Sequence, residues 1–397
     1  MSSMASGHDL AAPRTHLSRL PSLTGLRFVA AVMVFLFHSS LSNPAITPYS
    51  GRTATAVGHV FSRFGGVGVS FFFVLSGFVL FWSSKPGADN GRFWSRRAVK
   101  LFPNHLVTFA AAMALYAGAT TALQDWIPNV LLLQAWVPRF SAFFGVNIPS
   151  WSLSCELFFY LCFPLLARGI RKIAPGRLWL WAGLVAALVI CLPAIATALI
   201  HGGPMAPNFA ASVYRYWFVY VFPPVRMLEF VLGMLMARIV LTGHWINLRL
   251  KPALLIAVAG YLVALSVPPL YGLVAATVIP IALVIPAAAT ADLQAQSSPF
   301  RSRVMVRLGE VSFAFYLVHA SVLIVGRTAM GGGHYSAPVA FGVLLLLFGI
   351  SLALAWLLNV GVENPLMRRL APSSASAQIP SQRSASAQPA NEETAAV

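Results

Sequence analysis

Charge is scarce in this sequence, and negative charge is the scarcest. Only 9% of its 397 residues are charged, whereas an average soluble domain has about 25%. Hydrophobic residues make up 58% of the chain, and 10 Asp and Glu stand against 27 Lys and Arg, for a net charge of +17. A chain with so little charge cannot cover a soluble surface. Its composition excludes an ordinary soluble domain and indicates a polytopic membrane protein.

Cysteine is also rare, which excludes a disulfide-stabilised fold. The three cysteines, Cys155, Cys162 and Cys191, all lie in hydrophobic runs. Even the two nearest ones would be about 10 Å apart along a helix, too far for a disulfide. We therefore interpret them as packing residues.

Several sequence signatures of soluble enzymes are absent. The chain has no Gly-x-Ser-x-Gly, no His-Glu-x-x-His and no Gly-x-x-x-x-Gly-Lys. Phosphate-loop and zinc-protease chemistry thus have no support, and we expect no metal site. Residues 1–20 lack the pattern of a cleaved signal peptide, so we expect the first span to remain attached.

Long apolar runs are what the sequence does contain. Each is close to the roughly 17 to 25 residues that cross the hydrocarbon of a bilayer. They predict an all-α fold, a transmembrane helical bundle of about ten spans. The runs cover residues 24–41, 64–82, 104–124, 152–168, 178–200, 213–240, 252–268, 271–291, 309–327 and 338–360.

The cations are divided unevenly among the connections between these runs. With the N-terminus in the cytoplasm, most Lys and Arg fall on the cytoplasmic side, as the positive-inside rule requires. The exceptions are Arg52, Arg63, Arg139, Arg215, Arg226 and Arg327. The excess charge therefore reflects topology rather than binding to nucleic acid, and it predicts a multi-pass cell-membrane protein with both termini in the cytoplasm.

Three regions are expected along the chain. Residues 1–20 would form a flexible cytoplasmic segment, and residues 21–368 the transmembrane domain. Residues 369–397 are rich in Ala, Ser, Pro and Gln, a composition that cannot bury an apolar core, so we expect a disordered cytoplasmic tail.

Glu156 is a carboxylate within the apolar run 151–160. An ionisable group near mid-membrane costs roughly 2.5 to 3.5 kcal/mol, which makes it a candidate site residue by default. His38 follows Arg27 by about eleven residues, or ~16 Å of helix, which places it at the depth of Glu156 in the predicted topology. An imidazole and a carboxylate that orients it are the groups needed to take a proton from a hydroxyl. We predict that they form a catalytic pair, although depth alone does not bring them into contact and each could be a polar packing residue.

A cationic ridge precedes the third run. Arg92, Arg96 and Lys100 recur every four residues, with Arg97 beside them, so a helix would place them on one face. Such a ridge suits phosphate or pyrophosphate. Judged by charge alone, it fits an orientation signal or a contact with anionic lipid equally well.

Other polar and aromatic residues in the runs are further candidates. Arg226 and Glu229 are spaced to meet on one helical face, either as a self-neutralising ion pair or as part of a site. His319 could face either a cavity or a packing partner. The full set of additional candidate site residues is Arg226, Glu229, His319, Trp151 and Tyr160.

Two other features suggest structural roles. Glu363 ends the last run, where we expect it to anchor the helix. Ser76 and Gly77 are small neighbours within the second run, and small residues let membrane helices approach closely.

In their order along the chain, these segments resemble the integral-membrane acyltransferase 3 family. The resemblance covers about residues 20–368, and one such element would be weak whereas seven in register are specific. The elements are Leu23-Thr-Gly-Leu-Arg-Phe-Val-Ala-Ala31 followed by His38, the Phe-Phe-x-Leu-Ser-Gly-Phe segment ending at Phe78, the Arg-rich motif closing at Pro103, Trp151-Ser-Leu-Ser-x-Glu156 with Phe159-Tyr160, Arg226-x-x-Glu-Phe-x-x-Gly233, Leu308-Gly-x-x-Ser-Phe-x-x-Tyr-Leu-x-His319, and Glu363-x-Pro365.

This resemblance implies an O-acyltransferase. The family moves acyl groups from cytosolic acyl-coenzyme A, such as acetyl-coenzyme A, to hydroxyls of carbohydrates, envelope polymers and secondary metabolites. By position it implies that His38 is the general base with Glu156 as its partner. It also implies that the ridge, through Arg96, Arg97 and Lys100, lies near the phosphates of coenzyme A. Lys100 stands where a second arginine is usual, and His105 replaces a common tyrosine.

The acceptor is the least defined part of the prediction. The compact chain and its start resemble stand-alone family members that acylate sugar or macrolactone hydroxyls of macrolide antibiotics. An alternative within the same class is an O-acetyltransferase of cell-envelope polysaccharide. A different class is a proton-coupled transporter, in which the intramembrane His and Glu relay protons. The expected partners are acyl-coenzyme A, a hydroxylated acceptor and the lipid bilayer, but no nucleic acid.

Overall fold

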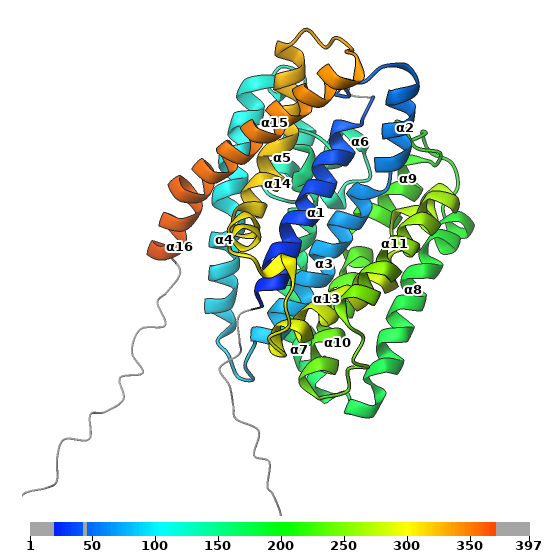
Figure 1. The fold of residues 1–397 in the computed structure, drawn as a ribbon, viewed down its shortest axis with the longest axis vertical. Coiled ribbons are helices and arrows are strands. Elements are labelled where there is room, and N and C mark those ends of the chain that lie inside the picture. The colour runs from blue at the N-terminus through cyan, green and yellow to red at the C-terminus, as the bar shows by residue number, and fades with distance from the viewer. Residues whose placement is uncertain (1–19, 43–45, 371–397) are drawn as a thin grey trace, which may run out of the picture.

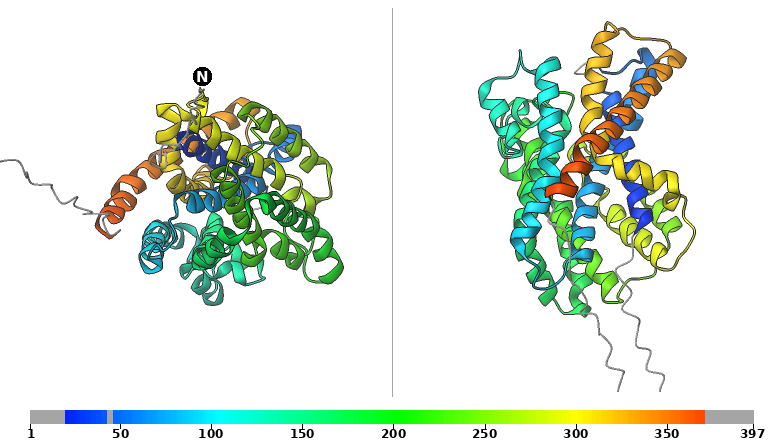
Figure 2. Two further views of the ribbon diagram at one scale, coloured as in Figure 1. Left: turned by 90° about the horizontal axis from the view of Figure 1, so that it is seen from below. Right: turned by 90° about the vertical axis from the view of Figure 1, so that its left-hand side faces the viewer.

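A computed structural model describes residues 20–42 and 46–370, and this part of the chain is almost entirely helical. Two isolated bridges, between Tyr49 and Tyr335 and between Met205 and Ser212, are the β-structure of the described residues. The helices form one elongated bundle (Figures 1 and 2). The predicted all-α membrane fold is confirmed. The segments expected to be flexible, 1–20 and 369–397, lie almost wholly outside the described residues.

The helices differ widely in length. The long ones are α1 (Pro21–Ser39), α3 (Phe64–Ser83), α4 (Asn90–Ala112), α7 (Trp151–Lys172), α8 (Leu178–Leu199), α10 (Pro223–Leu241), α11 (Leu250–Ser266), α13 (Val278–Leu293), α14 (Arg303–Ala329) and α15 (Ala337–Leu358). The shorter ones are α2 (Gly51–Phe61), η1 (Met113–Ala117), α5 (Leu123–Val130), η2 (Gln134–Trp136), α6 (Phe140–Phe143), η3 (Ile148–Ser150), η4 (Pro175–Arg177), α9 (Val213–Tyr216), η5 (Trp217–Val221), α12 (Pro269–Leu273), η6 (Pro299–Arg301), η7 (Asn359–Glu363) and α16 (Asn364–Leu370).

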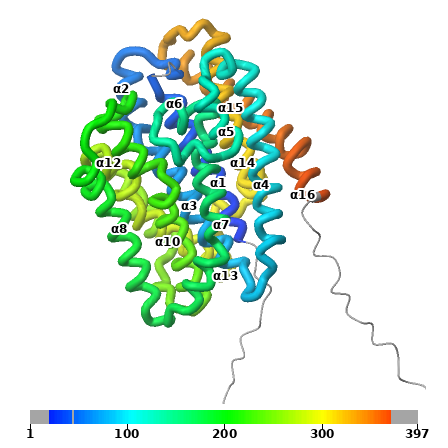
Figure 3. The backbone as a smooth tube through the Cα atoms, turned by 180° about the vertical axis from the view of Figure 1, so that it is seen from behind, coloured from blue at the N-terminus to red at the C-terminus, as the bar shows by residue number. Residues whose placement is uncertain are grey.

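Eight helical stretches in the described part of the chain are long and apolar enough to cross a membrane. The sequence predicted about ten. The difference comes from α10, which carries three charged residues including Arg226 and Glu229, and from α11, which has only 17 residues. The helix α10 is largely buried and packs against α3 (Figure 3), whereas α11 packs against α13 with one face and exposes most of its apolar residues. The predicted polytopic architecture is confirmed, with eight candidate spans in the described residues by length and composition.

Some boundaries differ from the predicted runs for identifiable reasons. The run 213–240 is interrupted after η5, and α10 begins at Pro223, because proline lacks a backbone N–H and favours the first turn of a helix. The third span is longer than predicted, because α4 is continuous from Asn90 and includes the whole cationic ridge. The ridge is thus helical, as its spacing indicated.

The most extensive helix contact in the bundle joins α3 to α10, and two glycines make it possible. A Cβ atom on Gly77 would lie 1.9 Å from the carbonyl oxygen of Phe230, and one on Gly233 would lie 1.9 Å from that of Val74. No side chain fits at such distances, so the two backbones touch only because both residues are glycine. The predicted close approach at Gly77 is confirmed.

The helix α1 packs against both α3 and α14. Its start lies at the lower end of the bundle in Figure 1, and its end lies beside α2 at the upper end. The helix α16 packs against α4 at the side of the bundle (Figure 2). This arrangement brings α1, α3, α4, α7 and α14 around a shared interior.

Candidate active site

Two cavities follow one another along the interior of the bundle. The smaller, of about 170 Å³, contains the side chains of three basic residues and is called the cationic cavity. The larger, of about 480 Å³, contains His38 and is called the histidine cavity. Along α3 the histidine cavity is lined down to Val69 and the cationic cavity from Val69 to Leu80, so the two are stacked end to end.

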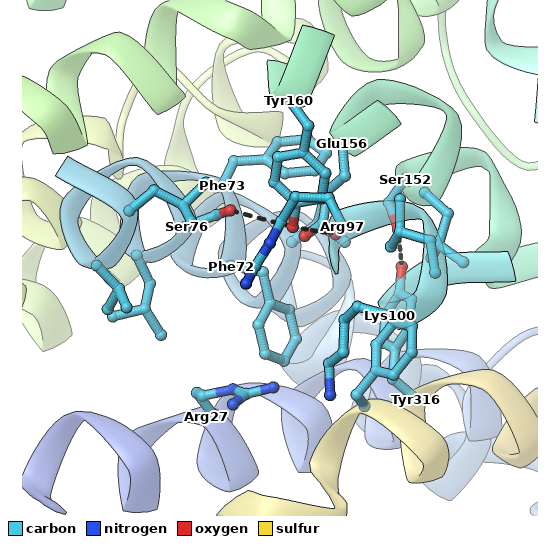
Figure 4. A pocket seen from close by; sticks show the side chains of 17 residues that line it. Arg27, Phe72, Phe73, Ser76, Arg97, Lys100, Ser152, Glu156, Tyr160 and Tyr316 are labelled. Carbon is cyan, nitrogen blue, oxygen red and sulfur yellow. Dashed lines mark hydrogen bonds between the residues drawn. The ribbon is translucent and has the colours of Figure 1, made fainter. Parts of the chain in front are cut away.

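The cationic cavity brings together residues from five long helices, α1, α3, α4, α7 and α14. Arg97 and Lys100 of α4 line it, as the ridge predicted, and Arg27 of α1 faces the same space (Figure 4). Arg92 is exposed and, like Arg96, is not among the lining residues. The inward half of the ridge therefore belongs to the cavity and the outward half does not.

Both lining cations of α4 are held in place by neighbours. The Arg97 guanidinium lies 6.0 Å from the centre of the Tyr160 ring and 5.8 Å from that of Phe93. Lys100 forms an ion pair with Glu363, whose other carboxylate oxygen accepts a hydrogen bond of 2.8 Å from the side-chain amide of Asn104. Glu363 thus connects the end of the last long helix to α4, consistent with its predicted anchoring role.

Glu156 lines the cationic cavity rather than the histidine cavity. Its carboxylate accepts a 3.0 Å hydrogen bond from the hydroxyl of Tyr160, one helical turn later, and the Ser76 hydroxyl lies 3.5 Å from the same phenol oxygen (Figure 4). No hydrogen bond joins Glu156 to His38 in the described structure. The predicted direct pairing of these two residues is not found. The sequence placed them at the same depth, but the stacking of two cavities separates them.

The partner of His38 is His319. The Nδ1 atom of His38 lies 2.8 Å from Nε2 of His319, and both rings are buried. The Nδ1 atom of His319 faces the backbone carbonyl of Phe315 at 3.3 Å. A carbonyl only accepts, so Nδ1 of His319 carries the hydrogen and its Nε2 carries the lone pair. His38 must then donate from Nδ1, which leaves the lone pair of His38 on Nε2.

This hydrogen-bond chain presents His38 as a proton acceptor. Its Nε2 atom has no hydrogen-bond partner in the described structure, and His38 lines the histidine cavity. A neutral imidazole with a free Nε2 lone pair, held by a partner at Nδ1, is the arrangement that general-base catalysis uses. The hydrogen-bond chain from His38 through His319 ends at the backbone carbonyl of Phe315, so no carboxylate takes part in it.

Nine aromatic side chains line the histidine cavity. Trp151, predicted as a further site residue, is among them, and Arg63 is a cation in its wall. No Asp or Glu lines it within the described residues. Its aromatic lining residues are Phe37, Tyr116, Phe140, Phe144, Trp151, Phe209, Tyr216, Tyr220 and Tyr316.

Arg226 and Glu229 form the ion pair that their spacing predicted. Their charged atoms lie 3.0 Å apart, and each side chain is 1% exposed. The same Arg226 nitrogen, Nη2, also donates to the hydroxyl of Ser70 at 3.2 Å, and the guanidinium lies about 5 Å from the rings of Phe73 and Tyr220. Neither charged residue lines a cavity, so the pair lies behind the aromatic walls.

Sequence reasoning missed two residues of the site. Arg27 was interpreted only as a topology marker, although it precedes His38 on the same helix within the first motif. Tyr316 was not singled out, although it lies one turn before His319 and lines both cavities.

His105, a departure from the family pattern, contacts the backbone of Asn129 at 3.0 Å and lies outside both cavities. Groups of three or more potential metal ligands are absent from residues 20–42 and 46–370.

Comparison with known proteins agrees with this architecture. Residues 20–360 match the Acyltransferase domain family, Acyl_transf_3. The chain is 42% identical over 364 residues to acyltransferase MdmB of Streptomyces mycarofaciens, which covers 89% of this chain and 92% of that protein. It is 26% identical over 329 residues to the exopolysaccharide production protein ExoZ of Rhizobium meliloti (strain 1021), covering 80% and 94% respectively. No solved structure matches it. The chain therefore belongs to the acyltransferase 3 family and is a multi-pass membrane acyltransferase.

Proposed function

We propose that this acyltransferase moves an acyl group from acyl-coenzyme A, bound at the cationic cavity, to a hydroxyl of a sugar or macrolide-type metabolite in the histidine cavity. The observation that carries this proposal is the pair of stacked cavities. One offers cations to a phosphorylated donor, and the next offers a histidine base to a hydroxyl.

The donor side rests on Arg27, Arg97 and Lys100, which face one cavity from α1 and α4. Arginine and lysine bind phosphate through charge-assisted hydrogen bonds. These three side chains lie toward the end of the bundle where α1 begins. By the positive-inside distribution, that end is the cytoplasmic one, where acyl-coenzyme A would be found, and both chain termini belong on the same side.

The acceptor side rests on His38. In the proposed step, Nε2 of His38 takes the proton of the acceptor hydroxyl, whose oxygen bonds to the thioester carbonyl carbon. The carbon–sulfur bond breaks, and the proton is returned to the sulfur, which leaves as the thiol of coenzyme A. His319 keeps the lone pair of His38 on Nε2. Positioned general bases contribute about 10²- to 10⁴-fold to a rate.

Glu156 receives a different role from the one that the sequence suggested. It lies with Tyr160 in the wall of the cationic cavity, facing the same space as Arg97. We place it there as a fixed negative group that orients Tyr160 and the neighbouring cations, and not as the partner of the base.

The lining of the histidine cavity supports the acceptor class. Aromatic faces pack well against sugar rings and macrolactones, and a volume of about 480 Å³ suits a bound small molecule or one end of a larger one. Arg63 is a cation in the wall, and no carboxylate opposes it among the described residues, so a neutral acceptor ring is favoured over an ammonium-bearing one. The 42% identity to acyltransferase MdmB also supports a stand-alone acyltransferase of this size.

Envelope polysaccharide is the second candidate acceptor, because a relative at 26% identity is named for exopolysaccharide production. Membranes that contain the protein should be incubated with acetyl-coenzyme A and either glycosylated macrolides or envelope oligosaccharides, with mass spectrometry of the products. We expect an acetylated macrolide and free coenzyme A thiol that appears only when an acceptor is present. Acylated oligosaccharide alone would move the proposal to the second acceptor, and flux across vesicles without thiol release would contradict acyl transfer.

A further inference from the structure

Tyr316 of α14 lies where the two cavities meet. It lines both of them, and so does Val69 of α3. Below these residues lie Arg97 and Lys100, and above them lies His38. Any path between the donor side and the acceptor side of the site therefore passes Tyr316.

The Tyr316 side chain is fixed by the neighbouring helices. Its hydroxyl lies 2.9 Å from the hydroxyl of Ser152 on α7 (Figure 4), and it donates to the carbonyl of Pro149 at 3.2 Å. Its ring packs edge-on against Phe72 of α3, with ring centres 5.7 Å apart. The residue is 5% exposed. A ring held at its tip by two hydrogen bonds and at its side by an aromatic neighbour makes a closed wall.

We propose that Tyr316 is the wall that keeps the donor thioester apart from the histidine cavity until an acceptor fills that cavity. This inference rests on the proposed function, because it assigns the donor and the acceptor to the two cavities. The hydrogen bonds to Ser152 and Pro149 hold the wall closed, and contact with the acceptor replaces them when it opens.

The chemistry makes such a wall necessary. A base that removes a proton from an acceptor hydroxyl removes one from water equally well. With water, the oxygen bonds to the carbonyl carbon and the carbon–sulfur bond breaks. The products are a free carboxylic acid and coenzyme A thiol. Keeping water from the thioester is therefore what makes the enzyme a transferase rather than a thioesterase.

The first test measures this partition. Tyr316→Ala removes the wall, and Tyr316→Phe removes only the hydrogen bonds. Tyr261→Ala is the control, because Tyr261 lines neither cavity. We expect the ratio of hydrolysis to transfer to rise at least about tenfold in Tyr316→Ala, the change produced by about 1.4 kcal/mol of barrier, and to rise less in Tyr316→Phe. An unchanged ratio in Tyr316→Ala would overturn the proposal.

The second test does not depend on catalysis. Ser76 lines the cationic cavity, so a Ser76→Cys variant in a background without Cys155, Cys162 and Cys191 reports access to that cavity. A membrane-impermeant thiosulfonate reagent is added to sealed vesicles on the side where the histidine cavity opens. We expect rapid labelling when Tyr316→Ala is also present and slow labelling with Tyr316 or with Tyr261→Ala. Equal labelling in all of them would overturn the proposal.

The two readouts separate the failure of the wall from the failure of the proposed function. If the unmodified protein transfers no acyl group to any acceptor, the proposed function fails, yet the labelling experiment still decides whether Tyr316 closes the passage. If Tyr316→Ala does not accumulate in membranes, Tyr316→Leu takes its place. Leucine keeps an apolar side chain but is too short to reach Ser152, so the same labelling is expected.

Discussion

Nδ1 of His38 lies 2.8 Å from Nε2 of His319, although 281 residues separate the two in the chain. The contact exists because α1 packs along α14. It also fixes which nitrogen of His38 bears the lone pair, since His319 is bound on its other side to the carbonyl of Phe315. The geometry of the candidate base is therefore set by a second histidine and a backbone oxygen.

Replacing His319 should lower the rate of acyl transfer through the orientation of His38. In His319→Leu, no acceptor remains for Nδ1–H of His38, so its ring loses both its orientation and its tautomer. We expect a fall in kcat that is smaller than the roughly 10²- to 10⁴-fold loss of a base, with KM for acyl-coenzyme A unchanged. In His319→Gln, the side-chain carbonyl can accept the same hydrogen bond and should restore part of the rate. Equal activity of the two variants would contradict this role.

Arg97 should contribute to donor binding, whereas Arg92 should not. Both lie on the ridge of α4, but only Arg97 lines the cationic cavity. A hydrogen bond to a charged group is worth about 1.5 to 3 kcal/mol, so Arg97→Gln should weaken acyl-coenzyme A binding about 10- to 100-fold. Arg92→Gln is the matched control and should leave KM for the donor unchanged. A similar rise in both variants would mean that general surface charge, and not the cavity, attracts the donor.

The Arg226–Glu229 pair should stabilise the fold only as a pair. Both side chains are 1% exposed, so removing one partner leaves a buried charge without its counterion. Glu229→Gln should destabilise the protein by about 3 to 5 kcal/mol. The double variant Arg226→Met with Glu229→Gln should lose less than the sum of the two single variants, measured by thermal unfolding in detergent. Additive losses would show that the two residues act independently.

Gly77 should be irreplaceable for a steric reason. A Cβ atom there would lie 1.9 Å from the Phe230 carbonyl, so Gly77→Ala forces α3 and α10 apart. We expect a strong loss of folded protein in membranes. Gly183 of α8 is the control, because a Cβ atom there meets no atom within 4 Å and Gly183→Ala should be neutral. Normal accumulation of Gly77→Ala would contradict the close packing.

Much of the fold could be predicted because membrane composition constrains it strongly. Long apolar runs can only be helices there, and small residues such as Gly77 mark close contacts. The number of spans was less predictable. The helix α10 carries three charged residues, of which Arg226 and Glu229 pair within the helix, and proline positions alone do not show whether an apolar run is broken.

The site was predictable in its residue types but not in its pairings. The ridge geometry followed from helical spacing, so Arg97 and Lys100 were found, whereas the inward and outward faces of the helix could not be distinguished. Residue counting along the spans put His38 beside Glu156, but it does not show which cavity each side chain lines. His38 contacts His319 beside one cavity, and Glu156 contacts Tyr160, one turn later on the same helix, beside the other.

The central claim is that His38 is the general base of acyl transfer. The most direct measurement is the rate of acyl product formation by His38→Ala in membranes, at a protein level matched to the unmodified enzyme and with saturating acyl-coenzyme A and acceptor. We expect a loss of about 10²- to 10⁴-fold in kcat with donor binding retained. Near-normal turnover of the folded His38→Ala variant would contradict it.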